Sequence, residues 1–194
     1  MGDARDILLK QTRDVKKTYK GEGTSLEIIY APRGPEGWSG LYWLEPANNW
    51  GGAPCGFNLK GAEKVTFWAR GLTGDEVLTE VKIGGIKGKY PDSDTVSLKN
   101  VGLSKERQMY GIDLRGKKMS HIVGGFCIIF DKYNNPDGAT VYIRDSIRNT
   151  NKKMKKSKLA LIISLFVFSA GCEKTPVKDL LFPAINDSQT WNDQ

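Results

Sequence analysis

The chain has 194 residues, 39% of them hydrophobic and 26% charged, which is the composition of a globular domain and excludes a largely disordered protein. Its net charge of +7 comes from one short run: residues 148–158 hold six basic and no acidic residues, whereas residues 1–147 hold 21 basic and 18 acidic ones. A domain without a basic face is not expected to bind nucleic acid.

Short apolar runs alternate with breaks rich in Gly, Pro, Asn and Asp, which supply the backbone conformations of tight turns. The opening residues 1–20 give no clear signal, because the apolar run at 7–9 is short. The remaining pattern predicts eight strands, at residues 24–30, 37–44, 64–70, 77–83, 95–98, 107–114, 122–130 and 139–147. We therefore expect an all-β fold, a two-sheet antiparallel β-sandwich of the jelly-roll type.

Alternation along these strands assigns side chains to two faces. The predicted inward side chains are mostly apolar: Val65, Phe67, Ala69, Val77, Thr79, Val81, Ile83, Val141, Ile143 and Ile147. The predicted outward side chains are mixed: Thr66, Trp68, Arg70, Leu78, Glu80, Lys82, Tyr142 and Arg144. The inward set closes a core, at about 25 cal/mol for each Å² buried. The outward set is typical of a sheet that faces a ligand.

An aromatic segment at 37–52 reads GWSGLYWLEPANNWGG, with four rings from Trp38 to Trp50. Indole rings stack on the flat C–H faces of sugars, while amides, carboxylates and guanidinium groups bond their hydroxyls. Trp43 shares its face with Leu41, so a place in the core is the alternative for it, and Trp68 is the best single candidate. The predicted ligand-binding residues are Trp43, Asn48, Asn49, Trp50, Trp68, Arg70, Glu80 and Lys82.

Several motifs carry a family resemblance, among them GFNLKGAEKVTFWARG, KIGGIKGKYPDSDT, YGIDLRGKKMSHIVGGF and NPDGATVYIRDSI. With these motifs, residues 1–147 resemble a bacterial family of secreted jelly-roll modules similar to carbohydrate-binding modules and galactose-binding-like domains. The resemblance implies one structural Ca²⁺, for which Asp3, Asp6 and Asp145 match the carboxylate positions. A solvated acidic surface is the alternative for these three residues.

Catalytic groups are scarce in this sequence. His121 is the single histidine, and Glu45 and Glu80 form the one attractive carboxylate pair for a glycosidase. No nucleophile elbow, phosphate loop or zinc signature occurs. We interpret the chain as a non-catalytic glycan-binding module. The alternatives are an accessory fragment of a glycoside hydrolase and a structural domain of a surface lipoprotein without a small ligand.

The C-terminal part differs in character from the rest. Met154 opens a basic stretch, followed by a ten-residue apolar run at 159–168 and by Ser-Ala-Gly ahead of Cys172. This is the make-up of a secretory signal, and Ala-Gly-Cys resembles the lipobox of bacterial lipoproteins. It predicts an exported protein of the cell envelope, held at the membrane by a lipid such as palmitate on Cys172. A short membrane anchor and a buried core segment are the alternatives, and ten helical residues span only about 15 Å of a hydrocarbon core about 30 Å thick.

These features divide the chain into a jelly-roll domain (1–150), a signal peptide or short hydrophobic anchor helix (151–172) and a polar linker or tail (173–194). An apolar run at 180–185 would suit a displaced first strand. Since a signal normally begins a chain, the order suggests joined reading frames or a rearranged fragment, with a true internal anchor as the alternative. Cys55 and Cys127 either pair in an oxidising compartment or remain thiols in the domain.

Overall fold

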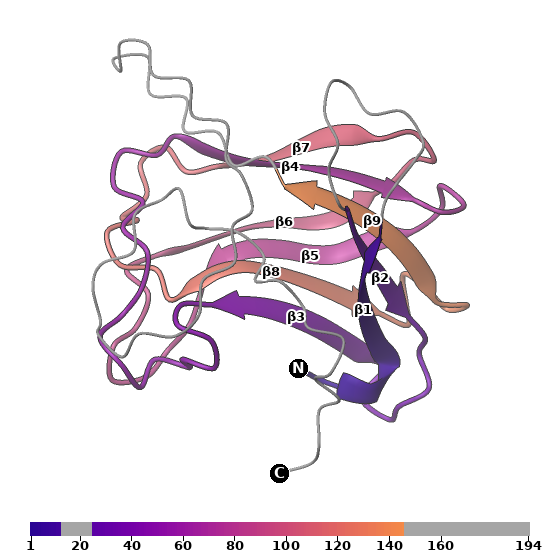
Figure 1. Ribbon diagram of the computed structural model, residues 1–194, viewed down its shortest axis with the longest axis horizontal. Coiled ribbons are helices and arrows are strands. Elements are labelled where there is room, and N and C mark those ends of the chain that lie inside the picture. The colour runs from indigo at the N-terminus through magenta and orange to yellow at the C-terminus, as the bar shows by residue number, and fades with distance from the viewer. Residues whose placement is uncertain (13–24, 146–194) are drawn as a thin grey trace.

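The computed structural model describes residues 1–12 and 25–145. In this part of the chain nine strands form two antiparallel sheets, one of five strands in the order β1-β2-β9-β4-β7 and one of four in the order β3-β8-β5-β6 (Figure 1). The elements are a 3₁₀ turn at Ala4–Asp6 and the strands β1 Ile7–Thr12, β2 Ser25–Tyr30, β3 Trp38–Leu44, β4 Lys64–Gly71, β5 Val77–Gly84, β6 Thr95–Gly102, β7 Gln108–Asp113, β8 Gly124–Asp131 and β9 Ala139–Asp145.

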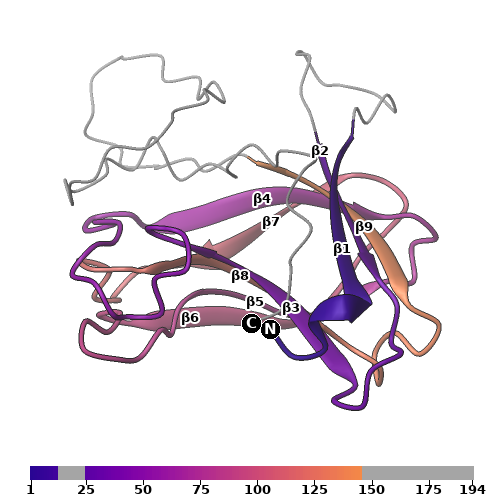
Figure 2. The same cartoon turned by 60° about the horizontal axis from the view of Figure 1, so that its bottom comes forward.

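The two sheets face each other as the layers of a β-sandwich (Figure 2), which confirms the predicted architecture. The core between them is built from side chains of both sheets. Tyr30 of β2 stacks on Phe130 of β8 with ring centroids 5.6 Å apart, and Phe67 of β4 meets Phe126 of β8 at 5.4 Å. All four rings are at most 6% exposed, so the inner faces of the sheets are sealed from water.

All eight predicted strands are present, and β6 is longer than predicted. The structure adds β1, which pairs along its whole length with β2. Its apolar run is short because β1 is an edge strand that needs apolar side chains on one side only. Ile7 and Leu9 pack against the core, while Leu8 is 50% exposed.

The predicted faces are confirmed for β9 as far as Arg144 and for most of β4, where Thr66, predicted to be outward, is buried. They are wrong in part for β5. Leu78 was expected to point outward and is fully buried, whereas Val77 and Thr79 are only half-buried. The amide of Asn135 holds the backbone of Val77, accepting from its N–H at 3.0 Å and donating to its C=O at 2.9 Å. On the neighbouring β6, Asn100 has a φ of 52°. These irregularities interrupt the alternation at the start of β5.

The crossing from the five-stranded to the four-stranded sheet, between β4 and β5, is held by Glu76. Its carboxylate is 5% exposed and accepts backbone N–H groups of Leu72 at 2.8 Å, Thr73 at 2.9 Å and Gly74 at 2.8 Å. Burial by itself would raise the pKa of this carboxyl, but the backbone hydrogen bonds lower it below its ordinary value. Glu76 therefore stays charged inside the turn.

Among the described residues no helix is long and apolar enough to cross a membrane. The predicted signal or anchor at 151–172, the lipid site Cys172 and the apolar run at 180–185 lie outside the described residues. Cys127 is a buried free thiol, so the predicted alternative of a Cys55–Cys127 disulfide is wrong.

Candidate functional site

The structure divides the predicted ligand face between the two sheets. Trp68 and Arg70 lie on β4 of the five-stranded sheet, and Glu80 and Lys82 lie on β5 of the four-stranded sheet. In both strands the intervening side chains are buried in the core, so each pair points outward from its own sheet. The two pairs consequently occupy opposite outer faces of the sandwich.

The aromatic residues of β3 are likewise separated by alternation. Trp43 faces inward, where its ring lies 5.9 Å from that of Phe126 and packs against the core. Trp43 therefore packs in the core, which was the alternative to its predicted place at the ligand site. Its neighbour Tyr42 points outward, and sequence reasoning missed it because alternation does not say which of two adjacent rings faces the core.

Three side chains gather with Tyr42 on the outside of the four-stranded sheet, and we name the group of Tyr42, Trp50, Glu80 and Lys82 the Tyr42 face. The rings of Tyr42 and Trp50 meet edge to face with centroids 5.9 Å apart. The Lys82 ammonium is 5.5 Å from the centre of the Tyr42 ring and 4.0 Å from the Glu80 carboxylate. The Tyr42 hydroxyl donates to the carbonyl of Gly84, and burial, with smaller effects of nearby acids, raises its pKa, so it stays neutral.

Trp50 is presented by the loop at 45–56, whose shape depends on Asn49. The Asn49 Nδ2 group donates to the carbonyls of Glu45 at 3.1 Å and Ala53 at 3.2 Å, and Oδ1 accepts from the N–H groups of Gly51 at 3.2 Å and Ala53 at 3.1 Å. These contacts use both donors and both lone pairs of the amide. Asn49 is 6% exposed, so it shapes the loop rather than facing a ligand.

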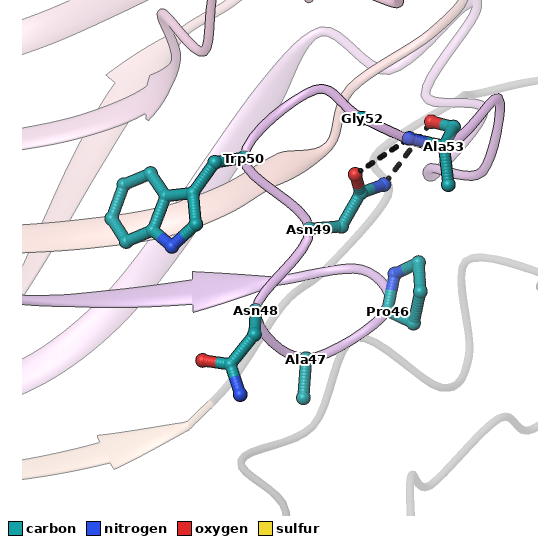
Figure 3. Close-up of a pocket in the computed structure, with 7 residues that line it drawn as sticks. All are labelled: Pro46, Ala47, Asn48, Asn49, Trp50, Gly52 and Ala53. Atoms are coloured by element: carbon teal, nitrogen blue, oxygen red, sulfur yellow. Dashed lines mark hydrogen bonds between the residues drawn. The ribbon is translucent and has the colours of Figure 1, made fainter. Parts of the chain in front are cut away.

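Asn48 and Trp50 leave this loop on the side away from the Asn49 amide, which is turned toward Ala53 (Figure 3). Trp50 is 50% exposed, and Asn48 is exposed with a φ of 62°. They border an open hollow of about 490 Å³. The hollow is lined by Pro46, Ala47, Asn48, Asn49, Trp50, Gly52 and Ala53.

The outer face of the five-stranded sheet holds a second group, Trp68, Arg70, Met109 and Tyr142, which we name the Trp68 face. The Arg70 guanidinium lies 3.8 Å above the Tyr142 ring, and the Tyr142 hydroxyl donates to Glu27 at 2.9 Å. Trp68 pairs across the strands with Met109, which is 53% exposed. Arg70 and Tyr142 are thus already engaged with each other.

The predicted calcium ligands at the start of the chain, Asp3 and Asp6, accept backbone N–H groups. One Asp6 oxygen, Oδ2, accepts the N–H groups of Arg33 at 2.7 Å and Gly34 at 2.8 Å. Asp3 accepts the N–H group of Gly37 at 2.9 Å. These carboxylates fasten the loop between β2 and β3 to the N-terminal turn.

Asp145 lies far along the sheet from Asp3 and Asp6. Ile7, next to Asp6, is level with Tyr30 and Ala139 in the strand register, and Asp145 lies six residues further along β9. At about 3.3 Å for each residue, the separation is about 20 Å. In the part of the chain that the structure describes, no three His, Cys, Asp or Glu residues are grouped to hold a metal ion. The structural Ca²⁺ implied by the resemblance stays a prediction.

Comparison with models of protein families and with curated protein sequences matched none of them to this chain. The resemblance to secreted jelly-roll modules therefore remains a prediction based on the motifs.

Proposed function

We propose that this chain is a non-catalytic glycan-binding module, a jelly-roll β-sandwich of an exported bacterial lipoprotein. The observation that carries the proposal is Trp50, a half-exposed indole whose ring contacts Tyr42. Its loop is fixed by the four hydrogen bonds of the Asn49 amide, and Lys82 lies beside the same Tyr42 ring and pairs with Glu80. A flat apolar ring kept in water by a structured loop is suited to stacking on a sugar. The charged pair next to it offers both a donor and an acceptor to hydroxyl groups.

In this mode of binding each member of the site has a separate task. The Trp50 ring covers the C–H face of one sugar unit, and its edge contact with Tyr42 fixes the tilt of the indole. The Lys82 ammonium donates to the saccharide and the Glu80 carboxylate accepts from its hydroxyl groups. Asn48, exposed on the same loop, extends the polar contacts toward the neighbouring unit.

The experiment that tests the proposal is affinity electrophoresis of the full chain in gels that contain plant or bacterial polysaccharides. We expect at least one polysaccharide to retard the protein, and Trp50→Ala to abolish the retardation. Trp68→Ala is the matched control, because it removes an indole from the opposite face. If Trp68→Ala removes the retardation and Trp50→Ala does not, the site lies on the other sheet. Release of reducing sugar from a retarding polysaccharide would favour the hydrolase alternative.

The proposed location rests on the C-terminal sequence. The basic start at Met154, the apolar run and the Ala-Gly-Cys ending at Cys172 support export followed by lipid attachment. Metabolic labelling with a fatty-acid analogue should modify a chain that starts at Met154 and should be lost in Cys172→Ser. Labelling that persists in Cys172→Ser, or that never occurs, would leave the short anchor as the explanation of this segment.

A further inference from the structure

We infer that the Tyr42 face selects anionic saccharides, with Lys82 binding a carboxylate or sulfate group of the sugar that stacks on Trp50. The inference rests on the proposed glycan binding and adds the ligand class. It follows from three features of the face: where the Lys82 ammonium lies, which charges the neighbouring loop presents, and what the nearby acidic groups bind.

The Lys82 ammonium is held beside the Tyr42 ring, which also contacts the Trp50 indole. Its side chain is 23% exposed and lies between the Tyr42 ring, at 5.5 Å, and Glu80, at 4.0 Å. Glu80 also pairs across the strands with the exposed Lys99. Asp131, another acid of this sheet, is four residues along β8 from the position paired with Lys82, or about 13 Å away. A partly desolvated ammonium binds an anion more strongly than a fully exposed one.

A second loop, at 84–94, adds exposed lysines beside Trp50. The two loops touch, because the Tyr90 N–H donates to the Gly51 carbonyl at 2.9 Å and a Cβ atom on Gly88 would lie 3.1 Å from the Trp50 carbonyl oxygen. Lys87 and Lys89, on either side of Gly88, are both exposed. They place positive charge on the loop that touches the Trp50 segment.

The acidic residues of that loop are already occupied. Asp92 accepts backbone N–H groups of Ile86, at 2.7 Å, and of Val123. Asp94 forms an ion pair with Lys117 at 3.9 Å and also accepts backbone N–H groups, which lower the pKa of its carboxyl. Lys87 and Lys89 are therefore the exposed charged side chains that this loop offers to a ligand, and they favour an anionic sugar.

The test compares matched pairs of polysaccharides by affinity electrophoresis of the full chain: polygalacturonate with its methyl ester, and dextran sulfate with dextran. The first pair isolates a uronate carboxylate and the second a sulfate. We expect the anionic member of at least one pair to retard the protein much more than its neutral partner. Lys82→Gln should weaken binding of that polymer about tenfold, equivalent to about 1.4 kcal/mol, and Lys82→Arg should restore most of it.

Glu80→Gln gives the most discriminating result. For an anionic polymer the competition of Glu80 for Lys82 outweighs its contact with sugar hydroxyls, so Glu80→Gln should tighten binding about threefold. Weaker binding of that polymer by Glu80→Gln would overturn this arrangement of charges. Lys105→Gln is the control, because Lys105 is an exposed lysine in the loop between β6 and β7, away from the Tyr42 face. Thermal unfolding of each variant verifies that it is folded.

The outcomes separate this inference from the proposed function. Retardation by a neutral polysaccharide that depends on Trp50, with none by its anionic partner, would overturn the anionic class and keep glycan binding. Equal losses in Lys82→Gln and Lys105→Gln would show attraction to net charge and would also overturn it. If no polysaccharide of any kind retards the protein, the proposed function itself fails.

Discussion

The Tyr42 face and the Trp68 face carry the same kinds of side chain on opposite sides of one core, yet they differ in how far these side chains are free to act. On the Trp68 face the Arg70 guanidinium lies 3.8 Å above Tyr142, whose hydroxyl is bonded to Glu27. On the Tyr42 face the prominent ring belongs to a loop residue, Trp50, which is half-exposed. Aromatic and charged residues on strands tend to satisfy one another, whereas a loop can hold a ring out toward a ligand.

The backbone of the loop explains why this exposure persists. Asn49 is buried beneath the loop with every hydrogen-bonding group of its amide satisfied, so the chain on either side has one defined course. A preorganised ring loses little side-chain entropy when it binds. The difference between the two faces therefore favours the Tyr42 face as the binding site. Four experiments test the packing, the sheet crossing and the separation of the two faces.

The largest loss of stability is expected from a change on the inner side of β8, in the core that lies between the two faces. Ile128 is fully buried and its neighbour Ile129 is half-buried on the outer side of the sheet. Ile128→Ala should lower the free energy of unfolding by about 2–5 kcal/mol, measured by chemical denaturation. Ile129→Ala removes the same atoms from the outer side and is the control. Equal losses for the two variants would contradict the assignment of inner and outer sides.

A smaller effect is expected at the crossing between the faces. Glu76→Gln leaves backbone N–H groups of the turn without their charged acceptor and should cost about 1–3 kcal/mol at neutral pH. The pKa of this carboxyl is lowered in the folded protein, so its stabilisation is complete above the ordinary pKa of Glu, about 4.3, and is lost as the pH falls through the folded pKa.

Denaturation curves of the two proteins at several pH values measure this difference. The wild type and Glu76→Gln should differ most near pH 7 and converge under acid conditions, below pH 4. A difference that stays constant over the whole range would mean that the charge of Glu76 makes no contribution.

A still smaller loss of stability is expected for a change on the Trp68 face, and this change should leave glycan binding unaffected. Arg70→Gln removes the guanidinium from above Tyr142 and should reduce stability by about 0.5–1 kcal/mol. Retardation by a glycan should not change, because Arg70 lies on the sheet opposite Trp50. Lost retardation in a folded Arg70→Gln protein would place the ligand on the Trp68 face.

The last test leaves stability unchanged and probes the sheet beneath the Tyr42 face. Cys127 pairs with both Tyr42 and Lys82 in the strand register and is fully buried. Burial raises the pKa of its thiol to about 12, so almost no thiolate exists at pH 8.5. Iodoacetamide should leave Cys127 unmodified in the native protein and alkylate it after unfolding, as mass spectrometry of the peptides would show. Rapid alkylation of the native protein would mean that this part of the sheet opens.

Much of the fold could be predicted because strands and turns have local signals. The positions of Gly, Pro, Asn and Asp located eight strands, and alternation placed Val65, Phe67 and Ala69 inside and Trp68 outside. The edge strand β1 was missed because its own apolar run is short. It is a strand because it pairs with β2, which begins more than ten residues later in the chain. Leu78 was misassigned because the alternation is interrupted at the start of β5. There the Val77 backbone is hydrogen-bonded to the Asn135 amide, which lies 58 residues away in the sequence.

For the candidate site, the sequence by itself determined which residue types are available and that Trp50 lies in a turn-rich loop. It could not determine that Trp68 and Glu80 belong to different sheets, because the alternation that separates inside from outside is the same in every strand. Only the tertiary structure assigned β4 and β5 to opposite layers and turned Tyr42, rather than Trp43, toward Lys82. The physical reason is that strand pairing joins segments far apart in the chain, and no local pattern encodes which strands become neighbours.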